Sequence, residues 1–495
     1  MPEKTIARLT QDADSLAAPP NSGERKSQVI HLIECARTAE RDSAVERVHE
    51  LTEQALQATG RGLDLNQADL SGLDLSDFDL RHAILNRAAL YRTTLARADL
   101  TGASMVCAGL ERTDFTEAIL RGAYVHALAA QASKFVGADL TGLVDATGAL
   151  FHGCDLSGAR LDNSELAGTT FYQCNLAGAH ARGTDFHGAV FNECRMEGAD
   201  LSRARLDDAM VTRSSMRRVT LDQARGGGLV IQRPTAADGL RLVGAHLPRL
   251  RLVSVRCRDL NAVGLHAPHL DIQDCHLASA DFSNADLSHS RWHGSAVDHA
   301  KFVGAVLTDA SFCQVSAVGA DLNDATGEGL TATECGFADA TFIGFAGRYA
   351  TFRNCDFRAA NLRGAYLYRS SFIGDPPASA CMVDTTLDGA NLTQAYLAAD
   401  FTGASLRQVW ATYARINQSI FNDADLRGAS LFRSSAVKTE FTDAQVGGQG
   451  GVLFADRCPG LVAALLAAPD PDSQRLAQLV EELTDLLNSD RGQST

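Results

Sequence analysis

The sequence predicts an all-β solenoid with four sides in each coil, because two repeats of different length run through it together. A leucine or a phenylalanine recurs every five residues, and the type of side chain recurs every twenty residues. Neither spacing fits the 3.6-residue period of a helix or the two-residue period of a long strand. Twenty residues therefore form one coil, and each of its four sides takes five residues.

Three ladders of identical side chains carry the twenty-residue repeat. Side chains alternate along an extended segment, so the large residue of each side and the residue two positions before it both point inward. We expect the ladders to form the structural core. Their members are Phe151, Phe171 and Phe191, then Cys154, Cys174 and Cys194, and finally Phe401, Phe421 and Phe441.

The chain divides into six parts. The five-residue rhythm covers 63–221 and 242–446, and at twenty residues per coil the span 63–446 is enough for roughly 19 coils. Three consecutive glycines and Pro234 interrupt it, which predicts an irregular break or loop over 222–241. Residues 1–23 are expected to be a flexible N-terminal segment and 24–60 an N-terminal helical cap, with a capping box at Ser43 and Glu46 and a stop at Gly60.

Residues 459–489 predict a second α-helical cap or a pair of dimerisation helices. Their apolar residues are spaced as one helical stripe. The stripe either covers the last coil of its own chain or pairs with a second copy, and we favour a homodimer because two-fold contacts are the commonest oligomers. The stripe consists of Leu476, Leu479, Val480, Leu483, Leu486 and Leu487.

Composition limits the classes of function. The formal net charge is -15, whereas a nucleic-acid-binding protein usually carries a basic domain, so no direct nucleic-acid contact is expected. Twelve cysteines are scattered without a CxxC pair, which argues against zinc and against a secreted disulfide framework. No run of 18 apolar residues occurs, so we expect no membrane contact and a cytoplasmic protein; export without a cleavable signal stays open.

Chemical motifs are also missing. Thiols of the cysteine ladder would lie parallel, one strand spacing apart, whereas zinc needs four ligands that converge on one point. No GxxxxGK[ST], HExxH or GxSxG motif occurs. We therefore expect a protein without catalytic residues, metal or cofactor.

Many five-residue segments resemble the pentapeptide-repeat family. Examples are ADLTG (98–102), CDLSG (154–158), CNLAG (174–178), ANLRG (360–364) and ADLRG (424–428). The resemblance implies a right-handed quadrilateral β-helix with a packed interior. It also implies a role for some members, which protect bacterial DNA gyrase and topoisomerase IV from poisons by imitating a DNA duplex.

Three aspartates are candidates for such mimicry. Asp79, Asp99 and Asp139 each precede an inward leucine at multiples of twenty residues and would form an acidic column. Duplex DNA carries one charge per about 1.7 Å, far more than a net charge of -15 provides along the whole solenoid. The alternative is that each aspartate only binds nearby backbone at a corner.

A basic segment lies in the middle of the chain. Between Arg195 and Arg258 there are 13 arginines and six acidic residues. Arg213, Arg217 and Arg218 represent this segment, which would bind an acidic or phosphate-bearing partner or would be a solvated surface.

These observations lead to two hypotheses about function. The first is a non-enzymatic, rigid scaffold for protein–protein interaction. The alternative is a DNA mimic that binds a type II topoisomerase and confers resistance to quinolone-type or natural-product poisons. In both, the partner is a protein.

Overall fold

The computed structural model describes residues 41–375, 380–446, 455–456, 474 and 478. The chain forms two compact units, Met1–His246 and Leu247–Thr495. The predicted flexible segment 1–23 lies outside the described residues. So do the six apolar residues predicted to form the stripe within 459–489. Among the described helices, none combines the length and the apolar character needed to cross a membrane.

Four parallel β-bridges, one on each side, join a coil to the next. The first coil shows the pattern, with bridges Asp64↔Ile84, Asp69↔Ala89, Asp74↔Thr94 and Asp79↔Asp99. Beside each bridge a backbone N–H donates to a carbonyl of the following coil, as from Leu65 to Ile84 at 2.8 Å. Stacking therefore satisfies the backbone polar groups of every side. This confirms the predicted class, an all-β parallel solenoid with four sides.

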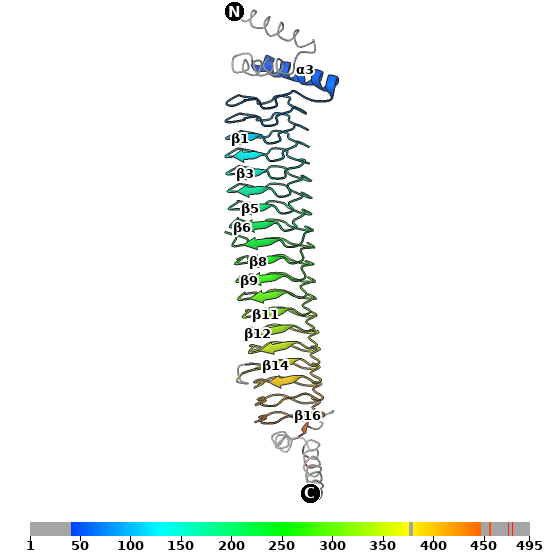
Figure 1. Cartoon of the computed structure of the whole chain (residues 1–495). Coiled ribbons are helices and arrows are strands. Elements are labelled where there is room, and N and C mark those ends of the chain that lie inside the picture. The colour runs from blue at the N-terminus through cyan, green and yellow to red at the C-terminus, as the bar shows by residue number, and fades with distance from the viewer. Residues whose placement is uncertain (1–40, 376–379, 447–454, 457–473, 475–477, 479–495) are drawn as a thin grey trace, which may run out of the picture. The chain divides into compact units, whose positions relative to one another are not determined.

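One side of most coils extends to a three-residue strand whose middle residue is buried (Figure 1). In the first unit these strands pair in chain order. They are β1 (Gly109–Glu111), β2 (Ala129–Gln131), β3 (Leu150–His152), β4 (Thr170–Tyr172), β5 (Val190–Asn192), β6 (Met210–Thr212) and β7 (Val230–Gln232).

The second unit repeats the arrangement, and its strands β8 to β15 also pair in chain order. A short pair, β16 with β17, follows. The strands are β8 (Arg251–Val253), β9 (Asp271–Gln273), β10 (Arg291–His293), β11 (Ser311–Cys313), β12 (Thr331–Thr333), β13 (Thr351–Arg353), β14 (Ser371–Ile373), β15 (Tyr396–Ala398), β16 (Ser434–Ser435) and β17 (Ala455–Asp456).

The number of coils with a regular strand differs from the prediction. In the described residues 15 coils carry a strand of this series, β1 to β15, fewer than the roughly 19 coils predicted at twenty residues per coil. The prediction counted every five-residue side, whereas the first coils and those after β15 are joined mainly by isolated bridges.

The predicted ladders lie in the core. The rings of Phe151 and Phe171 are stacked with centroids 5.1 Å apart, and those of Phe401 and Phe421 with centroids 4.8 Å apart. All members of the three ladders are at most 5% exposed. The residue two positions after each inward residue turns the corner with a positive φ, as at Asn163 with 55°. Asparagine, aspartate and glycine suit this conformation.

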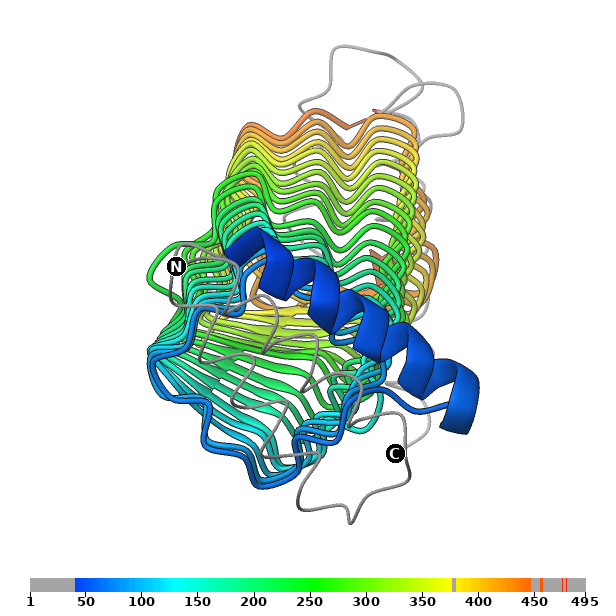
Figure 2. The same ribbon diagram turned by 90° about the horizontal axis from the view of Figure 1, so that it is seen from above.

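Helix α3 (Arg41–Thr59) covers the end of the first unit, as Figure 2 shows. Val48 and Leu51 are buried, and the Thr52 hydroxyl donates to the Asp79 carbonyl at 2.7 Å. The described part of 24–60 is thus a helical cap. Gly60 follows the helix with φ 69°, as predicted. The prediction of a capping box at Ser43 is wrong, because Ser43 already lies inside the helix.

The predicted break at 222–241 is not irregular. It contains β7, which pairs with β6 in the ordinary twenty-residue register, Met210↔Val230. One extra residue enters directly after β7, since the next bridge is Ser215↔Ala236. The five-residue rhythm of the sequence also shifts by one residue between Leu140 and Phe151, and this is likewise a single insertion, because Ala129 pairs with Leu150. Glycine and proline here mark a changed corner within continuing coils.

Candidate functional site

The three predicted aspartates share one column, but their carboxylates are engaged by their own coils. Bridges connect Asp79 with Asp99, Asp99 with Ile119, and Ile119 with Asp139. Each carboxylate accepts a hydrogen bond from the backbone N–H two residues later, at 2.9–3.2 Å. Asp79 and Asp139 are only 8% exposed. The geometry matches the alternative interpretation, local bonding at a corner.

Arginines neutralise two members of this column. Arg121 Nε lies 2.6 Å from Oδ2 of Asp139. Burial opposes ionisation of Asp139, yet hydrogen bonds from Thr141 and Arg121 hold its pKa below the usual value. Because an ion-paired carboxylate presents little net charge to a partner, the column does not form the row of free charges that a DNA mimic needs.

Asp79 belongs to a polar cluster beneath α3. His49 Nδ1 lies 2.7 Å from its Oδ2, and Arg81 binds both Asp79 and Glu53. His49, Glu53 and Asp79 each offer one ligand atom within 4.8 Å of the others. The Arg81 guanidinium already supplies the positive charge between the two carboxylates. These residues therefore fit an ion-pair network that attaches α3 to the first coil better than they fit a metal site.

The predicted arginines lie at successive corners of one coil. Arg213 follows β6 with φ 50°, and Arg218 turns the next corner with φ 53°. Arg213 Nη1 lies 3.5 Å from Oε1 of Glu193, one coil earlier. Arg217 and Arg218 are exposed. The three arginines thus occupy two corners instead of converging on one point.

The cysteine ladder is internal. The Cys174 thiol lies 3.2 Å from the Phe151 carbonyl, and Cys194 lies 3.3 Å from the Phe171 carbonyl. Hydrogen bonds with Cys154 and Cys194, together with burial, raise the pKa of the Cys174 thiol. Burial likewise raises the pKa of Cys275 to about 11. A protonated, buried thiol is a poor nucleophile and metal ligand.

The outer surface of the strands in the first unit is almost free of charge. We call the outward residues of β1 to β7 the uncharged sheet face. The first outward position is apolar or threonine on every strand, and the last carries Glu111 as its one charge. Leu150 and Met210 on this face are 44% and 42% exposed. The corresponding position of the second unit instead begins with Arg251 and Asp271, 3.1 Å apart.

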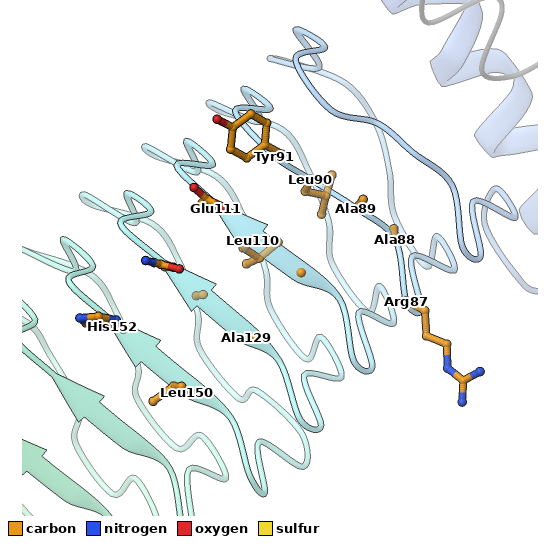
Figure 3. Close-up of a pocket in the computed structure, with 13 residues that line it drawn as sticks. Arg87, Ala88, Ala89, Leu90, Tyr91, Leu110, Glu111, Ala129, Leu150 and His152 are labelled. Atoms are coloured by element: carbon orange, nitrogen blue, oxygen red, sulfur yellow. The ribbon is translucent and has the colours of Figure 1, made fainter.

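A shallow depression of about 450 Å³ lies on the uncharged sheet face (Figure 3). Small residues of successive coils, Ala89, Gly109 and Ala129, are part of its lining. Tyr91 and Leu150 are among the larger residues that line it. The depression results from the sequence directly, because one column carries three small side chains before it reaches a leucine.

A group of exposed aromatic residues in the second unit was not predicted from the sequence. Tyr366, Asn391 and Trp410 form one outward column through two β-bridges. Their spacings of 25 and 19 residues hide the column from a search for twenty-residue steps. The exposed position of Trp410, directly before the inward Ala411, was the available signal.

Among curated proteins, none matches the sequence closely enough to count as a relative. Two solved structures are similar in part. A trypsin-treated form of QnrB1, a plasmid-mediated fluoroquinolone resistance protein, is 17% identical with a TM-score of 0.31, and the match covers 36% of this chain and 89% of that one.

The second is HetL from the cyanobacterium Nostoc, a pentapeptide repeat protein involved in the regulation of heterocyst differentiation. It is 20% identical with a TM-score of 0.14, and the match covers 64% of this chain and 86% of that one. Likenesses at these scores do not bear on function.

The family model for pentapeptide repeats matches in eight copies that together span half of the chain. The matched ranges are 61–95, 94–125, 133–176, 171–208, 293–326, 336–374 and 399–435. They coincide with coils in which large apolar residues and small residues alternate on the inside. On its sequence and its four-sided coils alike, the chain belongs to the pentapeptide-repeat family.

Proposed function

We propose that the protein is a non-enzymatic scaffold that binds a partner protein through the uncharged sheet face of its first unit. The observation that carries this proposal is the uninterrupted outward column Gly109, Ala129, Leu150, Thr170, Val190, Met210 and Val230. Charged residues make up 21% of the chain, yet none stands in this column. A protein interface is similarly depleted of charge at its centre.

The shape of this face supports binding of a protein rather than a small molecule. Each strand presents two outward residues in register with those of the next coil, which gives a regular surface with only a shallow depression. Small-molecule sites are usually deeper and enclose most of their ligand. The occupant that fits is a protein with a flat surface that is also poor in charge.

The test places charge on this face without disturbing the core. Cross-linking in the host should attach partner proteins to the wild-type chain. We expect the double variant Leu150→Lys and Met210→Lys to lose these partners. A control variant, Ala177→Lys, adds positive charge on another side of the same unit. It should keep those partners, and the circular dichroism of all variants should agree.

Two results would contradict the proposal. One is an identical set of cross-linked partners for the double variant and the Ala177→Lys control. The other is inhibition of gyrase supercoiling by the full chain that survives the double variant, which would favour the DNA mimic instead. The engaged carboxylates of Asp79 and Asp139 give that alternative less support than the scaffold.

A further inference from the structure

Exposed aromatic rings and arginines gather on one side of the second unit. We call them the aromatic–arginine cluster. They occupy outward positions and corners along one side of five successive coils, whose inward residues are Gly347, Leu367, Leu392, Ala411 and Leu431. The cluster consists of the half-buried Tyr368 and the exposed residues Arg348, Tyr349, Tyr366, Arg369, Trp410, Tyr413, Phe432 and Arg433.

The rings are unusually accessible for such large side chains. Trp410 is 64% exposed, and Tyr413 is 48% exposed. Tyr349, Tyr366 and Phe432 are each at least 40% exposed. Tryptophan, tyrosine and arginine are the residue types that dominate binding energy at protein interfaces. A patch with these three types at its centre therefore has the composition of a binding site.

Contacts within the cluster hold its side chains in place before any partner arrives. The Arg369 guanidinium lies 5.2 Å from the centroid of the Tyr368 ring, and Arg348 lies 5.4 Å from that of Tyr349. Arg369 Nε donates to Oε1 of Gln394 at 2.5 Å. Such cation–π and hydrogen-bond contacts reduce the conformational entropy that binding would otherwise cost.

A second group of contacts fixes the far end of the cluster. Arg433 Nη1 donates to the Tyr413 hydroxyl at 3.1 Å. The same guanidinium lies 5.3 Å from the centroid of the Phe432 ring. Trp410 has the largest exposed fraction of the exposed hydrophobic residues in the described chain. It lies between these two groups, one bridge after Asn391.

The charge of this surface is opposite to that of the protein. The segments that form it, 345–353, 365–373, 390–398, 409–416 and 429–436, contain several arginines and no aspartate or glutamate. The whole chain has a net charge of -15. Glu328 lies in the column of Arg348 one coil earlier, outside these segments. An acidic partner would meet attraction here and repulsion over most of the remaining surface.

We propose that the aromatic–arginine cluster binds an acidic segment of a partner protein. The carboxylates of that segment pair with the guanidinium groups of Arg348, Arg369 and Arg433, and its apolar side chains pack on Trp410. Arginine suits this role because its planar guanidinium can bind a carboxylate in a bidentate manner while it stays stacked on a ring. These residues are separate from the uncharged sheet face, so the inference does not depend on it.

A protein segment fits the cluster better than single-stranded nucleic acid. Bases need free ring faces for stacking, and several rings here already have a guanidinium over them. A polyanion would also be repelled by the negative net charge of the chain, whereas a short acidic segment carries far less charge.

The test uses the full chain and three labelled probes. The first is a short fluorescein-labelled peptide in which glutamates alternate with leucine and serine, the second has glutamine for every glutamate, and the third is an oligothymidylate. Fluorescence anisotropy should show preference for the glutamate peptide. Quenching of tryptophan emission should report the same event, because Trp292 is buried and Trp410 is the exposed one of two tryptophans.

Variants locate the site. We expect Trp410→Ala, and the double variant Arg369→Gln with Arg433→Gln, each to weaken binding of the glutamate peptide at least about 30-fold, the size expected of a hot spot. Trp410→Phe should retain most of the affinity. Arg427→Gln removes an arginine that pairs with Asp425 on another side of the same unit and should leave affinity within about twofold.

Several outcomes would overturn the proposal. They are no binding of the glutamate peptide, equal binding of the glutamine peptide, tighter binding of the oligothymidylate, or equal effects of Arg427→Gln and the cluster variants. Light scattering provides one more. Self-association of the full chain that Trp410→Ala abolishes would make a second copy the occupant instead of an acidic partner. Because every substituted side chain is exposed, unchanged circular dichroism should accompany each variant.

Discussion

The ring of Phe171 lies parallel to the ring of Phe191, with centroids 5.0 Å apart and planes 4° from each other. Phe171 is fully buried and stacks in the same way on Phe151. Replacing Phe171 with alanine would remove both contacts and leave a cavity between neighbouring coils. We expect Phe171→Ala to lower the free energy of unfolding by about 3–5 kcal/mol.

Urea denaturation and amide hydrogen exchange in β3 to β5 would measure this loss. Phe171→Leu should cost less, since leucine occupies the same column at Leu90 and Leu110. The exposed neighbour Gln173→Ala serves as the control, with an expected change within about 0.5 kcal/mol. Equal effects at Phe171 and Gln173 would contradict the ladder as a source of stability.

The cysteine ladder should tolerate serine. Ser214 occupies the next position of the column after Cys194, and its hydroxyl donates to the Phe191 carbonyl at 3.3 Å. Cys174 makes the equivalent contact with the Phe151 carbonyl at 3.2 Å. Because serine keeps this hydrogen bond, we expect Cys174→Ser to cost less than about 1.5 kcal/mol. Cys174→Leu should cost more, since the packed interior has no space for extra methylenes.

Thiol reactivity offers a second measurement on the same ladder. Ellman's reagent should modify Cys107, which is exposed, before it modifies Cys154, Cys174 or Cys194. Modification of the buried thiols should occur only at the rate of unfolding, because their side chains face interior carbonyls. Fast modification of Cys174 in the folded chain would contradict an internal ladder.

Gly226 should be the least replaceable glycine of 222–241. Its φ is 137°, and an added Cβ would lie 2.3 Å from the Asp207 nitrogen and 2.6 Å from the Leu206 carbonyl carbon. Since both obstacles are backbone atoms, neither can move cheaply. We expect Gly226→Ala to lower the free energy of unfolding by about 1–3 kcal/mol or more. Thermal unfolding followed by circular dichroism would measure it.

Gly178 provides the matched control for that substitution. It has φ 64°, and an added Cβ would meet no atom within 4 Å. Gly178→Asn should be nearly neutral, because Asn163 adopts the same conformation at an equivalent corner. A Gly226→Ala protein as stable as Gly178→Asn would show that the backbone can relax around position 226.

The repeat made most of the fold predictable from sequence. Each five-residue side places one large and one small residue inward, and stacking needs only that the next coil repeats the choice. Phe151, Phe171 and Phe191 therefore implied their own contacts. The segment 222–241 was misjudged because Gly226 is typical of a break in sequence, whereas in the solenoid it fills an inward position that has no room for a Cβ.

The candidate sites were less predictable for a different reason. Outward residues have no partner that the repeat dictates. An aspartate such as Asp139 can face solvent or bind the backbone of its own corner, and only coordinates distinguish the two. Trp410 was missed because an insertion and a deletion change the coil length around it. In its column, Tyr366 lies 25 residues before Asn391, and Asn391 lies 19 residues before Trp410.

Attachment of α3 should depend on pH through Asp79. Burial opposes ionisation of this carboxyl, but hydrogen bonds from Arg81 and His49 hold its pKa below the ordinary value. A carboxyl with a lowered pKa in the folded state contributes stability above its unfolded pKa of about 3.9, and this contribution is lost as pH falls through the folded pKa. Acidification below about pH 4 should therefore loosen α3 from the first coil.

Amide hydrogen exchange of α3 and the first coil, measured from neutral to acidic pH, would follow this change. Asp79→Asn should speed exchange already at neutral pH, as expected for the loss of about 1–3 kcal/mol from hydrogen bonds to a charged group. It should also remove most of the acid dependence. Asp339→Asn, at an exposed corner of the second unit, should do neither. If α3 exchanged equally in wild type and Asp79→Asn at every pH, its attachment would rest on buried residues such as Val48 and Leu51 and not on the Asp79 carboxylate.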